Sequence, residues 1–144
     1  MYLLDTVVLS ELRKEQRWRN PGVVAWIETV APADLFVSVL SIGESERGIE
    51  GQRAVHPAFA DALAGWLEVV LRVHGDRILP VTVGIARRWG KLSARIGNKG
   101  LDLAIAATAL EHGLTVATRN LADFAQTGAA SFNPFETPPR AERP

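Results

Sequence analysis

Tyr2-Leu3-Leu4-Asp5-Thr6 opens the chain with an apolar run that ends in a carboxylate and a hydroxyl. Such a run suits a fully buried parallel strand, although three residues alone do not exclude a helix. Asp is depleted inside strands, so we expect Asp5 where the strand ends. The carboxyl ends of strands line the ligand crevice of an open α/β sheet. Asp5 is therefore either a site residue or the cap of a helix that starts at Val7, and further carboxylates at the same edge would decide between them.

The composition predicts one globular domain, since the chain has 144 residues of which 47% are hydrophobic. It has no cysteine, which rules out disulfides and thiolate metal sites. His56, His74 and His112 lack the spacing of a zinc site. No membrane span or signal segment is expected, and this favours a cytoplasmic protein. The formal net charge is zero, so nucleic-acid binding would have to rest on local clusters.

Apolar periodicity predicts that helices and strands alternate from start to finish. Pro80 places its strand near a sheet edge, and Ile85, Trp89, Leu92 and Ile96 are predicted to face inward from one helix. This order calls for an α/β fold, a three-layer α/β/α sandwich with a mainly parallel central sheet. We expect one domain over residues 1–135 and a flexible tail over 136–144. The expected helices are about 7–14, 23–30, 58–73, 83–96 and 101–110, with one more that has Glu44 inside its first turn and reaches about Ile49. The expected strands are about 35–40, 78–81, 114–118 and 130–133.

Carboxylates follow three of the predicted strands, and a fourth opens a buried helix. Each has a local alternative, such as a capping box between Ser41 and Glu44 or helix-dipole stabilisation of Asp102. Parallel strands bring their carboxyl ends to one edge, where clustered carboxylates repel unless a cation compensates. Oxygen ligands favour Mg²⁺ or Mn²⁺, which assist phosphodiester hydrolysis. The four residues are Asp5, Glu44, Asp102 and Asp123.

Four motifs occur in order over about residues 2–135, and together they resemble PIN-domain ribonucleases, specifically the VapC-like toxins of type II (VapBC) toxin–antitoxin pairs. The resemblance implies an Mg²⁺- or Mn²⁺-dependent endoribonuclease acting on RNA. It also implies a VapB-like antitoxin, encoded beside it, whose C-terminal segment blocks the site, and a homodimer. The motifs are Leu4-Asp5-Thr6 with Leu9-Ser10-Glu11, Ser41-x-x-Glu44 with Gly48, Asp102-x-x-Ile105-Ala106-Ala107-Thr108-Ala109, and Ala117-Thr118-Arg119-Asn120-x-x-Asp123-Phe124.

By position, the resemblance makes the four carboxylates a catalytic, metal-binding quartet. Thr6 would set the loop after the first strand, Thr118 would be a polar group beside the quartet, and Asn120 would orient Asp123 or a bound water. Two departures stand out. The family usually has Asn where this chain has Val7, and the loop before Asp102 lacks a frequent proline.

Two clusters of basic residues are candidate contacts. One is a stripe that we predict to bind RNA, or alternatively to be a solvated helix face: Arg87, Arg88, Lys91, Arg95 and Lys99. The other, from Arg13 to Arg19, is a candidate for RNA-backbone or antitoxin contacts. Trp18 and Trp26 are candidates for an apolar groove that receives an antitoxin helix, or else for ordinary core.

Three other functions share some features of this sequence, and two of them lack a required residue. A haloacid-dehalogenase-like phosphatase needs a second Asp where Val7 stands, and a receiver-like signalling module needs a Lys where Arg119 and Asn120 follow Thr118. A PIN-like domain that is weak or inactive, and that binds RNA or a partner protein without cutting, remains open because Val7 removes a polar group.

Overall fold

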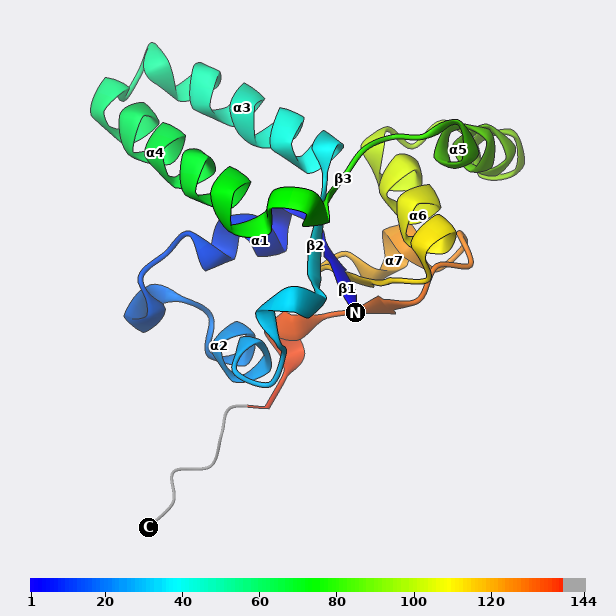
Figure 1. Cartoon of the computed structure of the whole chain (residues 1–144), viewed down its shortest axis with the longest axis horizontal. Helices are drawn as coiled ribbons and strands as arrows, with labels where there is room; N and C mark the ends of the chain where they lie inside the picture. Colours follow the sequence, from blue (N-terminus) through cyan, green and yellow to red (C-terminus); the bar gives the residue numbers. More distant parts are fainter. Residues whose placement is uncertain (139–144) are drawn as a thin grey trace.

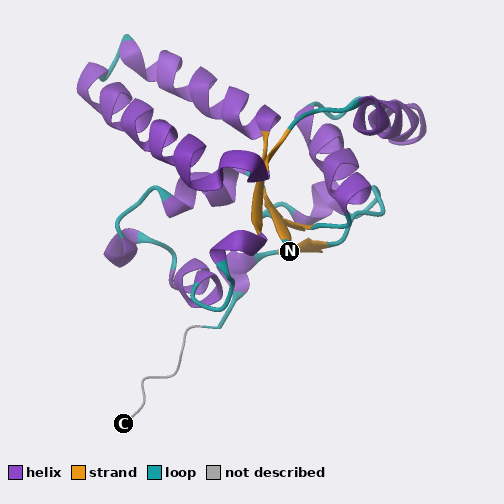
Figure 2. Ribbon diagram, in the orientation of Figure 1, coloured by secondary structure: helices purple, strands orange, loops and turns teal. Residues whose placement is uncertain are grey.

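The computed structural model describes residues 1–138, which form a parallel sheet between two layers of helices (Figure 1, Figure 2). The described strands lie in the order β3-β2-β1-β4-β5. Leu3, in the central strand, pairs with Phe36 on one side and Val116 on the other. The edge position of β3 confirms the inference from Pro80. The strands are β1 (Tyr2–Leu4), β2 (Leu35–Ser38), β3 (Ile78–Leu79), β4 (Thr115–Ala117) and β5 (Ser131–Phe132).

The helices divide between the two faces of the sheet, which confirms the three-layer α/β/α prediction. Helices α1, α2, α3 and α4 share one core, and α5, α6 and α7 share the other. Their bounds are α1 (Thr6–Leu12), α2 (Pro21–Ile27), α3 (Val39–Arg53), α4 (Pro57–His74), α5 (Val83–Ile96), α6 (Leu101–His112) and α7 (Leu121–Phe124), with short 3₁₀ turns η1 (Gln16–Trp18), η2 (Pro32–Asp34), η3 (Gly75–Arg77) and η4 (Pro134–Glu136).

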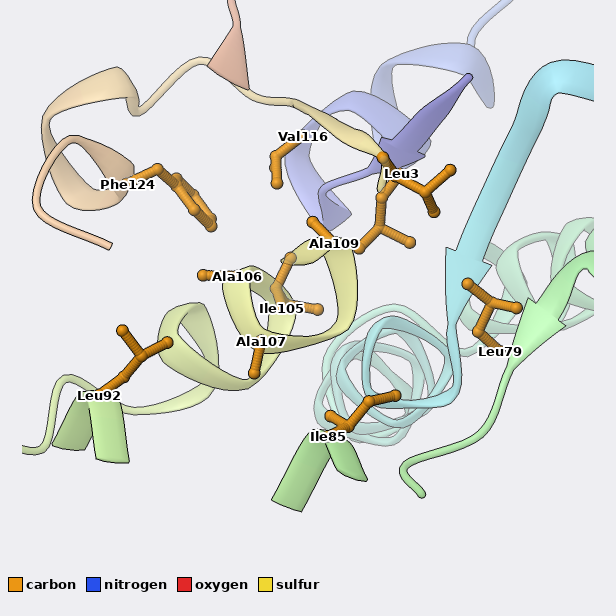
Figure 3. Packing of buried hydrophobic residues seen from close by; sticks show 11 residues of the cluster. Leu3, Leu79, Ile85, Leu92, Ile105, Ala106, Ala107, Ala109, Val116 and Phe124 are labelled. Atoms are coloured by element: carbon orange, nitrogen blue, oxygen red, sulfur yellow. The ribbon is translucent and has the colours of Figure 1, made fainter. Parts of the chain in front are cut away.

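Helix α6 is the buried helix that its apolar sequence predicts. Its alanines at 106, 107 and 109 are fully buried, and these small side chains let the helix lie close to its neighbours. Figure 3 shows Ile105 among side chains from the sheet, such as Leu3, and from α5, such as Ile85. The sheet and α5 therefore fix the position of the α6 backbone in the core.

The segment after β2 departs from the prediction of a strand over 35–40, followed by a helix that has Glu44 in its first turn and ends at about Ile49. The Ser38 hydroxyl accepts a hydrogen bond from the Leu40 amide at 3.1 Å and caps α3. The helix therefore begins at Val39, and it runs past Gly51 to Arg53, where an ion pair to Glu50 supports its last turn. The predicted end of this helix at about residue 49 was wrong because helical packing against α4 outweighs the low helix propensity of Gly51.

Two further expectations concern the surface and the chain end. Trp89 was predicted to face inward, but its side chain is 39% exposed, because α5 packs on α6 through Ile85 and Leu92 instead. Within residues 1–138 no helix combines the length and apolar character needed to cross a membrane. The predicted flexible tail, 136–144, begins at the end of η4, and residues 139–144 lie outside the described part of the chain.

Candidate active site

Asp5 lies directly after β1 and is held by hydrogen bonds of both its backbone and its carboxylate. Its amide donates to the Ala117 carbonyl oxygen at 3.0 Å. Its carboxylate accepts from the Thr6 amide at 2.8 Å and from the Thr118 hydroxyl at 2.8 Å. The residue is buried and is also the N-cap of α1. The helix cap and the site residue, which the sequence presents as alternatives, are therefore the same group.

Thr118 joins the ends of β1 and β4. Its side chain is fully buried, and its hydroxyl donates to Asp5 while accepting from the Asn120 amide at 3.0 Å. The Asn120 side chain makes no hydrogen bond within residues 1–138. Its predicted role in orienting Asp123 is therefore not supported by a direct hydrogen bond between the two side chains. Asp123 lies in the first turn of α7 and is exposed.

Glu44 comes to the site from α3. Its carboxylate accepts a hydrogen bond from the Thr6 hydroxyl at 2.8 Å, which links α3 to α1 across 38 positions of sequence. The Ser41 hydroxyl is buried and has no hydrogen-bond partner in the described residues, and Ser38 is the N-cap of α3. The capping box between Ser41 and Glu44 therefore does not form, and Glu44 faces the site instead of its own helix end.

The environment of Asp102 shows that the four carboxylates lie near one another. Gly100, with a φ of 70° that favours glycine, precedes α6, and Asp102 lies half-buried in the first turn of that helix. Burial raises the pKa of Asp102, and the charges of Asp5, Asp123 and Glu44 raise this pKa further, in that order. A negative charge in the first turn of a helix is favoured by the helix dipole, which acts in the opposite direction. Four elements that are far apart in sequence thus bring their carboxylates within electrostatic reach of one another.

The chemistry of this donor set fits a hard divalent cation. Carboxylate oxygens without sulfur or a histidine pair suit Mg²⁺ or Mn²⁺. Among the described residues, no three or more Asp, Glu, His or Cys side chains are already close enough to coordinate an ion. Asp5 and Glu44 are fixed by their hydrogen bonds, so Asp102 and the exposed Asp123 would make most of the adjustment on binding.

The predicted RNA-binding stripe lies on the outer face of α5 and in the loop after it, and all five of its residues are exposed. Two of them are already engaged: Arg88 forms an ion pair with Glu111, and Arg95 donates to the Gln126 carbonyl oxygen at 3.3 Å. The Arg95 bond joins α5 to the turn after α7, on which Asp123 lies. The remaining three have no ion pair in residues 1–138: Arg87, Lys91 and Lys99.

The two tryptophans proposed for a partner groove have different environments. Trp18 is 68% exposed, whereas Trp26 is 3% exposed and packs edge-on against Tyr2, with ring centroids 5.1 Å apart. Trp26 also contacts Phe132 across the same core. Trp26 is therefore a core residue, and only Trp18 is available at the surface.

One buried carboxylate near the site was missed as a separate feature. Glu11 forms an ion pair with Lys14 at 2.8 Å and accepts from the Asn20 amide at 2.7 Å. Burial alone would raise the pKa of Glu11, but these contacts and the charge of Arg119 lower it overall. The Arg119 guanidinium stacks on the Phe135 ring, 3.8 Å from its centroid. The sequence motif includes Glu11, but only the fold shows that its carboxylate binds the Asn20 amide and so links the end of α1 to the start of α2.

Comparison with known proteins places these features in a family context. The family model described as the PIN domain matches residues 2–130. The VapC ribonuclease Y4jK of Sinorhizobium fredii is 34% identical over 143 residues, which covers 94% of the chain and 99% of the relative. Toxin FitB of Neisseria gonorrhoeae is 30% identical over 146 residues, with the same coverage of 94% and 99%.

Solved structures agree with this result. The crystal structure of FitAcB from Neisseria gonorrhoeae matches with a TM-score of 0.81 at 32% identity, covering 94% of the chain and 99% of that chain. A toxin-antitoxin complex from Klebsiella pneumoniae matches with a TM-score of 0.63 at 25% identity, covering 93% and 98%.

Proposed function

Because the chain belongs to the PIN domain family, we propose that it is a divalent-metal-dependent endoribonuclease that hydrolyses RNA phosphodiester bonds. We further propose that it is the toxin of a toxin–antitoxin pair and acts in the cytoplasm, where RNA is available. The relative Y4jK is named a ribonuclease and FitB a toxin, which supports both parts of this proposal.

The observation that carries the proposal is the convergence of four carboxylates from four separate parts of the chain. The charges of Asp5, Asp123 and Glu44 all act on Asp102, whose pKa is raised first by burial and then by these charges. A site that holds such repulsion is suited to a cation, and Mg²⁺ or Mn²⁺ matches its ligands. When bound, such an ion neutralises charge that develops on a phosphoryl group and helps to activate water.

The chain's own residues prepare this site through Thr6 and Thr118. The Thr6 amide and hydroxyl bind Asp5 and Glu44 respectively, so one residue sets the spacing of two carboxylates. Thr118 fixes the second oxygen of Asp5 from inside the core. Asp102 would complete the set from α6, and Asp123 would complete it from the more exposed α7. With two carboxylates held in place and the other two able to adjust, the site could accept a metal ion and an RNA phosphate together.

Val7 bears on whether the site cuts RNA or only binds it. Its side chain is 38% exposed and lines a shallow hollow on α1 together with Thr6. Glu44 and Asp5 keep their hydrogen bonds although this position carries no polar group. Cutting is therefore the better-supported function, and binding of RNA or a partner without cutting is the alternative.

Two protein partners belong to the proposal. The first is an antitoxin, supported by the match to the toxin-antitoxin complex from Klebsiella pneumoniae. The second is another copy of the chain, which would form a homodimer. Its support is an apolar hollow of about 320 Å³ that is lined by the exposed side chains of Val81, Trp89 and Leu101. Exposed apolar side chains gathered around a hollow form a surface that a second copy of the chain could cover.

The test is cleavage of a structured RNA pool, such as total tRNA, by metal-free protein titrated with Mn²⁺ or Mg²⁺. Metal-dependent cutting that disappears in Asp102→Asn supports the nuclease and the quartet together. Cutting that survives the substitution means contamination or a different site. If neither protein cuts, the binding-only function is favoured, and Val7→Asn becomes the next variant to assay.

A further inference from the structure

Arg13 differs from the other cations of its cluster because it has no anionic or carbonyl partner. Its guanidinium carbon lies 5.4 Å from the centroid of the Phe59 ring, which holds the charge in place by a cation–π contact. Within residues 1–138 no group accepts a hydrogen bond from its side chain, so five N–H donors stay unused. The other three cations are bound to carboxylates or backbone carbonyls: Lys14, Arg17 and Arg19.

The half-buried Arg13 lines a groove that begins at the carboxylate site. This groove, a hollow of about 270 Å³ between α1, α3 and α4, includes both Thr6 and Glu44 among its lining residues. Arg13 is the single cation of that lining. The rest of the wall is mixed, with hydroxyl and amide groups beside apolar side chains: Ser10, Ser45 and Gln52 are polar, and Ile49, Phe59, Leu63 and Trp66 are apolar.

We propose that this groove binds single-stranded RNA next to the scissile bond, and that Arg13 donates hydrogen bonds to a backbone phosphate. The inference rests on the proposed ribonuclease function and names the path of its substrate. An RNA strand approaching the quartet meets negative charge, so a phosphate beside the cut needs a cation of the protein. Phe59 orients the Arg13 fork without using its donors, and a planar fork is the group that best matches a phosphate.

The mixed lining favours RNA over a protein helix as the occupant. Hydroxyl and amide groups can bind ribose and phosphate oxygens, and the aromatic side chains of Phe59 and Trp66 in the groove wall could contact a base. An apolar partner helix would leave the Arg13 donors and the Ser10 hydroxyl without partners, which costs free energy. The Ser45 hydroxyl already donates to the Ser41 carbonyl oxygen at 2.9 Å.

Binding of RNA tests the proposal independently of cleavage. The protein carries Asp102→Asn so that the RNA stays intact, and a short fluorescent single-stranded oligoribonucleotide is titrated in Mg²⁺ at several salt concentrations. Arg13→Gln should raise Kd about tenfold, the effect of losing one charge-assisted hydrogen bond. It should also reduce the slope of log Kd against log salt by about 0.7, the value for one lost phosphate contact on a single strand.

Three further variants make the result specific. Arg13→Lys should restore the salt slope but only part of the affinity, and Phe59→Leu should weaken binding with the slope unchanged. Arg72→Gln removes an exposed arginine of α4 that does not line the groove, and it should change neither quantity. Circular dichroism and thermal melting confirm that each variant folds.

Several outcomes would overturn the inference. Unchanged binding by Arg13→Gln would mean that the groove serves a protein segment or nothing. An equal loss in Arg72→Gln would indicate general charge attraction. A loss with an unchanged salt slope would make Arg13 structural, and a loss only in Lys91→Gln would place the strand on α5. The wild-type protein is assayed in parallel for cutting, so a failed nuclease function is recognised separately.

Discussion

Replacing Asp102 by Asn should stabilise the metal-free protein while it abolishes metal-dependent cutting. The substitution keeps the shape of the side chain and removes its charge. Three carboxylates repel Asp102, and each interaction contributes a few tenths of a kcal/mol when discounted for the exposure of a half-buried group. Against this stands the loss of a favourable charge in the first turn of α6, about 0.3–1 kcal/mol. The raised pKa of Asp102 shows that the unfavourable effects of burial and repulsion are larger.

The expected gain in unfolding free energy is therefore up to about 1 kcal/mol, or roughly 3 °C in Tm for a domain of this size. Mn²⁺ at a hundredfold excess over its Kd should raise the stability of the wild-type protein by about 2.7 kcal/mol, and most of this gain should be missing in the variant. Both quantities come from thermal melts with EDTA and with Mn²⁺. Asp76→Asn, which removes an exposed carboxylate outside the quartet, is the control. If Asp102→Asn instead lowers the metal-free Tm by several degrees, Asp102 supports the helix, and the reasoning about repulsion fails.

Three other predictions concern Thr118, His74 and Trp89. Thr118→Val keeps the volume of a fully buried side chain but removes a hydrogen bond to the Asp5 carboxylate. Urea unfolding should therefore show a loss of about 1.5–3 kcal/mol in stability, and kcat should fall by a larger factor than KM rises. A loss of stability with unchanged kcat would refute the positioning role. Burial lowers the pKa of His74 below its ordinary 6.5, so the unfolded chain binds a proton at this residue more readily than the folded protein does, and stability should fall as pH drops below about 6.5. In urea unfolding, His74→Gln should lose less stability over this pH range than the wild-type protein. An identical loss would contradict the role of His74 in the pH dependence. Trp89→Ser, at the apolar hollow, should shift the mass measured by light scattering from dimer to monomer, and an unchanged dimer would place the interface elsewhere.

The layers and the sheet edge could be predicted from the sequence because they follow from apolar periodicity. Alternating strands and helices lead to a parallel sheet, and the all-apolar run of α6 identifies the helix that the core surrounds. The start of α3 could not be predicted, since Val37, Ser38 and Val39 all suit a strand and only the Ser38 cap decides where the chain turns. Trp89 was misplaced for a related reason. Periodicity shows which residues are apolar, but not which of them the neighbouring helix will cover.

The site itself depended on contacts that span the chain. The bond from Thr6 to Glu44 joins positions 38 residues apart, and the bond from Thr118 to Asp5 joins positions 113 apart. No local pattern indicates either pairing. In the same way, the sequence does not distinguish Arg13 from the other cations at positions 13–19. Only the fold shows that those cations already have hydrogen-bonding partners, whereas Arg13 lies over the Phe59 ring.

The capping alternatives for these carboxylates are part of how the site works. In a parallel α/β sheet, helices begin at the edge where the strands end, and that edge collects the positive ends of helix dipoles. Asp5 caps α1, and Asp102 and Asp123 lie in the first turns of α6 and α7. Each helix start therefore offsets part of the repulsion among the quartet and makes a cluster of negative charge tolerable before a cation arrives. Glu44 is the exception, since it lies beyond the first turn of α3 and depends on the Thr6 hydroxyl instead.

Thr6→Val should therefore free the Glu44 side chain but not Asp5, whose carboxylate still accepts a hydrogen bond from the amide of residue 6. Asp5 would stay fixed in the variant, and affinity for Mn²⁺ would fall through Glu44 alone.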